Sequence, residues 1–192
     1  FIRRDRNHPS VILWSFGNEV GEQGSGREGA ELARRLARII KEEDPSRPVT
    51  ASMNFARPGT PMAEVVDVIC LNYQGEGIRD MPAYTGLQGI TTPPLYSAFR
   101  IHFPTKMIIS CENAAAVSSR GAYLFPVTDA LSAPVREGQG GDPVTRQVSG
   151  YELYTADFGS SVDKVFFVQE LHPFVAGGFV WSGWDYLGEP TP

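Results

Sequence analysis

The feature that most constrains the fold is an alternation of short apolar segments with amphipathic ones. The first apolar run, at 11–16, is followed directly by Gly17, Asn18 and Glu19. A run of this length bounded by turn residues is typical of a strand buried on both faces of a parallel sheet. Parallel α/β sheets place their functional groups at the carboxyl ends of the strands. Asn18 and Glu19 are therefore candidate functional residues.

A second apolar segment, at 107–111, has the same arrangement and ends at Glu112. Because parallel strands of one sheet end at the same edge, we expect Glu19 and Glu112 to face one pocket. A pair of carboxyl groups in one pocket suits the hydrolysis of a glycosidic bond. One group is protonated and assists the departing oxygen, while the other is ionised and attacks the sugar carbon.

The remaining segments continue the alternation of strands and helices. A capping box, Ser25 to Glu28, predicts a helix whose apolar face carries Leu32, Leu36, Ile39 and Ile40 and which ends at Asp44-Pro45. The residues between Asn113 and Ser149 are predicted to form a long polar loop. Further strands are expected at 49–52, 67–71 and 177–182, and further helical segments at 62–66, 95–103 and 163–171.

Five short strands with intervening helices favour part of a (β/α)8 barrel over a doubly wound sheet. A Gly-rich phosphate loop after a strand is missing from the sequence, which argues against a nucleotide-binding fold. A complete barrel needs about 250 residues, whereas the chain has 192. The chain also stops at 189–192 without a closing helix. We therefore expect the C-terminal five strands of a barrel.

Composition narrows the possible partners. The net charge of -5 provides no basic surface for nucleic acid or an anionic membrane, and no apolar stretch reaches the ~18 residues of a membrane helix. Cys70 and Cys111 lie in apolar strands, so we expect free, buried thiols. Neither they nor the three scattered histidines have the spacing of a metal site, and no metal or cofactor is predicted. Oligomeric state and compartment have no signal in the sequence.

Three motifs resemble glycoside hydrolase family 2. The segment RDRNHPSVILWSFGNE at 4–19 is similar to the acid/base signature of the family, and SCE at 110–112 looks like its nucleophile strand end. The segment GGFVWSGWDYLGEPTP at 177–192 resembles the last barrel strand and following loop of the β-galactosidase branch. The resemblance implies that the five strands are strands four to eight of the barrel. Strands one to three and the N-terminal β-sandwich domains of the family would then lie outside this chain.

The resemblance also implies a retaining double displacement. Glu112 would be the nucleophile and Glu19 the general acid/base. Asn18 matches the asparagine that hydrogen-bonds the sugar 2-hydroxyl, and Tyr73 matches a tyrosine that hydrogen-bonds the nucleophile. Trp181 would form the floor of the sugar subsite.

Two further residues, Trp184 and Asp185, are expected loop contacts for sugar hydroxyls.

Each candidate residue also has a purely structural interpretation. A glutamate at a strand end is more often solvated or ion-paired than catalytic, Tyr73 could be an ordinary core-edge tyrosine, and Trp181 could serve packing alone. We interpret three other glutamates as loop charges, namely Glu22, Glu76 and Glu189.

The identity of the sugar is less constrained. The β-glucuronidases of the family carry an Asn-x-Lys motif for the uronate carboxylate, and the 192 residues contain none, which counts against a glucuronide. A β-galactoside is favoured, but alanines stand at 114–116 where better-known galactosidases have a histidine. Their metal site is therefore not transferred. A β-mannosidase, a β-glucuronidase, an endo-glycanase and a non-catalytic sugar-binding fragment remain alternatives.

Overall fold

The structure is a computed structural model that describes residues 1–76, 93–115, 144, 158–160 and 162–182. Most of the long loop predicted between Asn113 and Ser149 lies outside these residues.

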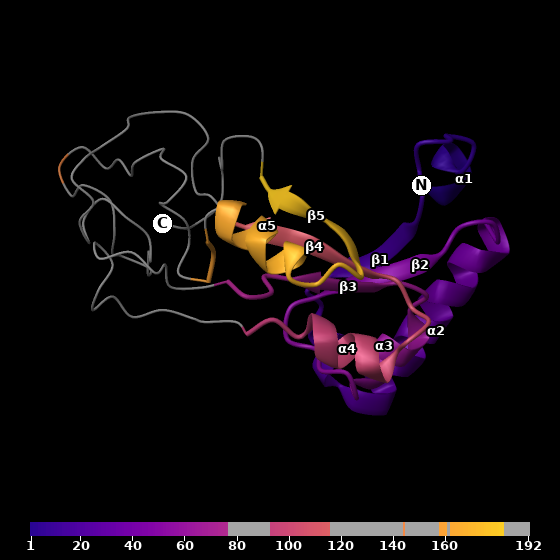
Figure 1. Ribbon diagram of the computed structural model, residues 1–192. Coiled ribbons are helices and arrows are strands. Elements are labelled where there is room, and N and C mark those ends of the chain that lie inside the picture. The colour runs from indigo at the N-terminus through magenta and orange to yellow at the C-terminus, as the bar shows by residue number, and fades with distance from the viewer. Residues whose placement is uncertain (77–92, 116–143, 145–157, 161, 183–192) are drawn as a thin grey trace. The chain divides into compact units, whose positions relative to one another are not determined.

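Each predicted strand and helix has a counterpart, with bounds shifted by a few residues at most. The elements of the described residues follow in chain order (Figure 1): α1 Ile2–Asp5, β1 Trp14–Asn18, the 3-10 turn η1 Gly21–Gly24, α2 Gly26–Glu43, β2 Val49–Met53, α3 Pro61–Val65, β3 Ile69–Asn72, α4 Tyr96–His102, β4 Ile108–Ala114, α5 Val162–Glu170 and β5 Val175–Trp181.

The strands form one sheet in the order β1-β2-β3-β4-β5. The pairs β1–β2 and β2–β3 are parallel, with Trp14 opposite Val49 and Ser52 opposite Cys70. Each strand lies beside the one that precedes it in the chain, as in a (β/α)8 barrel. The prediction of an α/β fold with part of such a barrel is confirmed.

The chain divides into two compact units, and each is described by itself. The first unit comprises 1–72, 95–111 and 174–176, and it holds β1 to β3 and α1 to α4. The second unit comprises 73–94, 112–173 and 177–192, and its described part holds the end of β4, α5 and most of β5.

Two apolar clusters form the core of the first unit. The first cluster joins β1, α2 and β2 and consists of the buried residues Trp14, Ile40 and Val49. Figure 1 shows α2 and α3 along one side of these strands. The second cluster consists of buried Val68, Cys70 and Ile109, against which Leu13 and Cys111 pack. Neither Cys70 nor Cys111 forms a disulfide, as predicted, but Cys111 is only partly buried, whereas both thiols were expected to be buried.

The expectation that the first strand is buried on both faces is wrong. Trp14 is the one fully buried residue of β1, and Ile12 just before it is 67% exposed. By contrast, every residue of β3 is buried. The reason is position in the sheet, because β1 is an edge strand of the described sheet and β3 is a central one.

The buried face of α2 also differs from the prediction. It consists of Gly29, Ala30, Ala33 and Ile40, whereas Leu32 and Ile39 are exposed. A methyl group added at Gly29 would lie 1.9 Å from the Glu22 carbonyl oxygen. The helix therefore approaches its neighbours through small residues.

The two ends of α2 follow the sequence signals unequally. The helix ends at Asp44 as predicted, and the Asp44 N–H donates to the Ile40 carbonyl at 2.8 Å. Ser25 occupies the N-cap position, but its hydroxyl makes no capping hydrogen bond. The helix therefore begins where the capping box predicted, but without the predicted hydrogen bond from the Ser25 side chain.

In the described part of the chain, none of the helices has the length and apolarity to cross a bilayer.

Candidate active site

Within the first unit, β1 delivers Asn18 and Glu19. Asn18 is the last residue of β1, and Glu19 follows it with a positive φ of 52°. The Glu19 N–H donates to the Ser52 carbonyl at 2.9 Å, so the backbone of Glu19 is fixed against the end of β2. The carboxyl group of Glu19 is thus carried on a rigid strand end.

Asn72, the last residue of β3, joins Asn18 to Glu19. Its side chain is fully buried, and its Nδ2 donates to Asn18 Oδ1 at 3.1 Å and to Glu19 Oε1 at 2.9 Å. One amide group therefore orients both residues. Sequence reasoning did not select Asn72, although a polar residue that ends a fully apolar strand just before Tyr73 is a signal that could have found it.

Within the second unit, Tyr73 contacts Glu112 twice. The Tyr73 N–H donates to the Glu112 carbonyl at 2.8 Å, and the Tyr73 hydroxyl donates to Glu112 Oε1. The Tyr73 ring also packs edge-on against Phe158, with centroids 4.9 Å apart. Both the backbone and the carboxylate of Glu112 are therefore held by one residue.

Left-handed backbone recurs at the strand ends. Glu19, Tyr73 and Ala114 have φ values of 52°, 53° and 74°, and each follows or ends a strand. Such conformations cost about 1–3 kcal/mol each for residues with a side chain, and they cluster at functional sites. The backbone hydrogen bonds of Glu19 and Tyr73 described above offset this cost.

The interpretation of Glu76 as a loop charge is wrong. Glu76 is fully buried, and its Oε2 accepts a hydrogen bond from the Ala114 N–H at 2.7 Å. Burial raises the pKa of Glu76 to about 8, an effect that the Ala114 N–H and Lys164 oppose and that the charge of Glu112 adds to. Glu76 therefore carries a proton at neutral pH.

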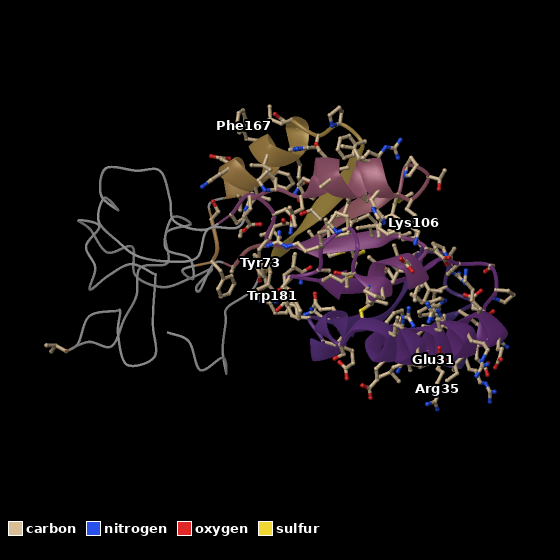
Figure 2. The ribbon with its side chains drawn as sticks, turned by 90° about the horizontal axis from the view of Figure 1, so that it is seen from below. Glu31, Arg35, Tyr73, Lys106, Phe167 and Trp181 are labelled. Atoms are coloured by element: carbon tan, nitrogen blue, oxygen red, sulfur yellow. The ribbon has the colours of Figure 1, made fainter. Side chains whose placement is uncertain are left out.

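The remaining predicted site residues lie at or beyond β5. Trp181 is the last residue of β5 and is 40% exposed. Figure 2 labels it together with Tyr73, and both lie at the carboxyl ends of their strands. Trp184 and Asp185 lie outside the described residues. The described residues contain no group of three or more His, Cys, Asp or Glu side chains placed to hold a metal ion.

Glu19 belongs to the first unit and Glu112 to the second. The structure brings Asn18 and Glu19 together through Asn72, and it brings Tyr73 and Glu112 together directly. In each unit, taken by itself, one of the two candidate carboxyl groups is oriented by hydrogen bonds at a strand end.

Comparisons with known proteins define the family. The sequence pattern of the glycosyl hydrolases family 2 TIM barrel domain matches residues 1–132, so the chain belongs to glycosyl hydrolase family 2. A beta-galactosidase of Bacteroides ovatus is 32% identical over 224 residues, covering 100% of this chain and 24% of the relative. A beta-glucuronidase of Chlorocebus aethiops is 43% identical over 195 residues, covering 100% of this chain and 26% of the relative.

Solved structures support the same fold. A calcium-binding mutant of Bacteroides uniformis beta-glucuronidase 2 superimposes with a TM-score of 0.58 and 22% identity, covering 99% of this chain and 21% of that chain. The present chain thus spans about a quarter of the length of the relatives it matches.

Proposed function

We propose that this chain carries the catalytic strand ends of a retaining, exo-acting β-glycosidase and that its substrate is a β-galactoside. The single observation that carries the proposal is the Tyr73–Glu112 pair, in which the Tyr73 hydroxyl donates to Glu112 Oε1. A carboxylate held in this way has a defined orientation, which a nucleophile needs. Family membership supports the same conclusion.

The first step forms a glycosyl-enzyme. A lone pair on the Glu112 carboxylate forms a bond to the anomeric carbon as the bond to the aglycone oxygen breaks. Glu19 gives its proton to that leaving oxygen. In the second step the Glu19 carboxylate takes a proton from water, whose oxygen attacks the anomeric carbon and releases Glu112. This sequence requires the two carboxyl groups to lie about 5–5.5 Å apart.

Four other residues complete the proposed site. Asn18 would hydrogen-bond the sugar 2-hydroxyl, a contact that strengthens as the transition state forms. Trp181 would offer its ring face to the sugar C–H groups, consistent with its partial exposure. Trp184 and Asp185 would contact hydroxyl groups from the following loop.

We further propose that the 192 residues supply strands four to eight of a barrel whose other strands and β-sandwich domains belong to a longer protein. The coverage of about a quarter of each relative supports this arrangement. A sugar-binding or inactive fragment is the alternative for the chain by itself, because edge strands without partners tend to associate. Turnover of a chromogenic β-galactoside by the isolated 192 residues would contradict that alternative.

Variants of the two glutamates test the mechanism in the full-length protein. Glu112→Ala should abolish turnover, and azide should restore it by attacking the anomeric carbon in place of the carboxylate. Glu19→Ala should still form the glycosyl-enzyme from a dinitrophenyl glycoside, whose leaving group needs no proton, but should fail on an alkyl glycoside. Equal losses on both substrates would contradict the role of Glu19.

The sugar is tested by a panel of nitrophenyl glycosides. The β-galactosidase relative and the absence of Asn-x-Lys from these residues favour the β-galactoside. The β-glucuronidase relative, at higher identity, supports the β-glucuronide as the second candidate. The highest kcat/KM among β-galactoside, β-glucuronide and β-mannoside decides between them, and a preference for either of the latter two would overturn the galactoside.

A further inference from the structure

Glu76 is a buried carboxyl group that the mechanism above does not use. It is fully buried in the second unit, three residues after Tyr73 in the turn that follows β3. Its Oε2 accepts the Ala114 N–H at 2.7 Å, while its Oε1 has no hydrogen-bond partner among the described residues. A buried carboxyl group with one unpartnered oxygen needs a reason to be there.

The turn that carries Glu76 is itself tightly constrained. Gly75 has a φ of +73°, and a methyl group added there would lie 2.8 Å from Val168 Cγ1 of α5. Tyr73 at the start of the turn has a φ of +53°. The turn therefore needs glycine at position 75, and in this conformation both Tyr73 and Glu76 contact the end of β4.

The end of β4 is held at each of its last three residues. Tyr73 N–H donates to the Glu112 carbonyl at 2.8 Å, and Asn113 Nδ2 donates to the Phe179 carbonyl at 2.8 Å. Ala114 donates its N–H to Glu76 Oε2 and accepts from the Ser160 N–H at 3.0 Å. Among the groups that contact Asn113 and Ala114 in these hydrogen bonds, the Glu76 carboxyl group is the ionisable one.

We propose that Glu76 is a positioning residue for Glu112: its carboxyl group anchors the backbone two residues beyond the nucleophile and thereby fixes the direction of attack. The inference rests on the proposed function, because it takes Glu112 as the nucleophile. Tyr73 and Glu76 then act as one clamp, since both belong to the same turn and hold residues on either side of Asn113.

The anchor depends on the protonation state of Glu76. The charged groups that act on it are Glu112 of β4 and Lys164 of α5, and burial raises the pKa of Glu76 to about 8. Oε2 accepts the Ala114 N–H, and Oε1 is the oxygen without a partner among the described residues. Above this pKa a buried anion forms beside the Glu112 carboxylate, with the Ala114 N–H as its one hydrogen-bond donor among the described residues, which favours rearrangement of the turn toward solvent or Lys164. The Ala114 N–H itself favours the ionised form, so the loss that we expect above pH 8 comes from this rearrangement and not from a weaker hydrogen bond.

The test uses pH profiles of kcat/KM in the full-length protein. The substrate is the 2,4-dinitrophenyl form of the glycoside that the wild type hydrolyses fastest, because its leaving group makes Glu19 unnecessary in the first step. The wild-type profile should fall above about pH 8. Glu76→Gln, which keeps an acceptor for Ala114 and stays neutral, should remain within ~3-fold of wild type at pH 7 and lose this fall. Glu76→Ala should lose ~100-fold in kcat/KM at pH 7, the scale expected for a misplaced reacting group.

The control is Asp44→Asn, which alters a buried carboxylate of the first unit and should leave the profile unchanged. Melting curves establish that each variant folds, and if Glu76→Ala does not, the profile of Glu76→Gln decides. A wild-type-like alkaline fall in Glu76→Gln, or wild-type kcat/KM in a folded Glu76→Ala, would overturn the inference alone. Undiminished turnover in Glu112→Ala would overturn both the inference and the proposed function.

Discussion

At the residue scale, each candidate catalytic carboxyl group accepts a hydrogen bond from a residue at the end of β3, of which the sequence predicted Tyr73 and missed Asn72. Asn72 ends the fully buried strand β3 and donates to both Asn18 and Glu19. Its neighbour Tyr73 serves Glu112 in the same way. Consecutive residues at the end of β3 therefore contact the two candidate carboxyl groups, Asn72 in the first unit and Tyr73 in the second.

Asn72→Ala should impair acid assistance. Without the Nδ2 bonds, Glu19 and Asn18 lose their common donor, and the proton of Glu19 is less well aimed at the leaving oxygen. General acid catalysis contributes about 10²–10⁴-fold, so we expect ~10–100-fold lower kcat/KM on alkyl glycosides and a much smaller loss on dinitrophenyl glycosides. Steady-state kinetics on the two substrates measure the difference.

Asn54→Ala is the matched control for this prediction. Asn54 follows β2, and its Oδ1 accepts a hydrogen bond from Gln23 Nε2 at 2.8 Å. The Asn54→Ala substitution therefore removes a similar amide group that does not contact Asn18 or Glu19. It should change both substrates alike and by little. An equal loss on both substrates in Asn72→Ala would show that Asn72 does not act through Glu19.

At the element scale, the short helix α3 depends on a residue distant in sequence. Lys106, just before β4, is half-buried and donates through Nζ to the carbonyls of Ala63, Glu64 and Val66 at 2.9, 2.9 and 2.6 Å. These carbonyls lie at the C-terminal end of the helix, where intrahelical donors are missing. Burial lowers the pKa of Lys106, while Asp67 and Glu64 oppose this shift. The ammonium group is the cap of α3.

Lys106→Met should destabilise the fold by about 1–3 kcal/mol, because hydrogen bonds from a charged donor are lost and three carbonyls are left without it. Urea unfolding followed by circular dichroism measures the change. Arg38→Met is the control, since its pair with Glu42 is 3.8 Å long and exposed, and it should stay within about 0.5 kcal/mol of wild type. Similar values for both variants would contradict the capping role.

The elements themselves follow from the sequence more closely than their burial does. Apolar runs bounded by Gly, Pro and Asp predicted all five strands and α2, because these residues act through local backbone preferences. Burial depends on neighbours. The exposure of Ile12, Leu32 and Ile39 follows from the edge position of β1 and the close approach of α2 through Gly29, neither of which is a local property.

At the scale of the molecule, one ion pair ties the N-terminal segment to the sheet. Buried Asp44 accepts from Trp14 Nε1 at 2.8 Å, from Ser46 Oγ at 2.5 Å and from Arg47 Nη1 at 2.6 Å. Arg47 in turn donates to the carbonyls of Val11, Arg6 and His8. The hydrogen bonds from Ser46 and Trp14 hold the pKa of Asp44 well below its usual range. The Asp44–Arg47 ion pair therefore makes the free energy of unfolding depend on pH.

Asp44→Asn should lower the melting temperature at pH 7 and weaken its dependence on acid. The native pKa of Asp44 is lowered, so its stabilisation is complete above the unfolded-state pKa of about 3.9 and is lost as the pH falls toward the native value. The difference between the wild type and the variant should therefore shrink steadily as the pH falls below about 4. Melting curves between pH 7 and pH 2 measure this.

Glu31→Gln serves as the control, because Glu31 lies on the exposed face of α2 (Figure 2) and its pair with Arg34 is 3.5 Å long. Its melting temperature should follow the wild type at every pH. A constant difference between wild type and Asp44→Asn across the range would contradict the proposed linkage.

The sequence by itself determined the order of strands and helices and the family, and it predicted the two glutamates, because these follow from local periodicity and from contiguous motifs such as 4–19. Only the tertiary structure decided what surrounds them. Within each unit, Asn72 and Glu76 acquire their contacts because segments distant in the chain lie side by side. A polar residue in a turn is a solvated charge or a buried anchor according to what packs over it, and that depends on segments distant in the chain.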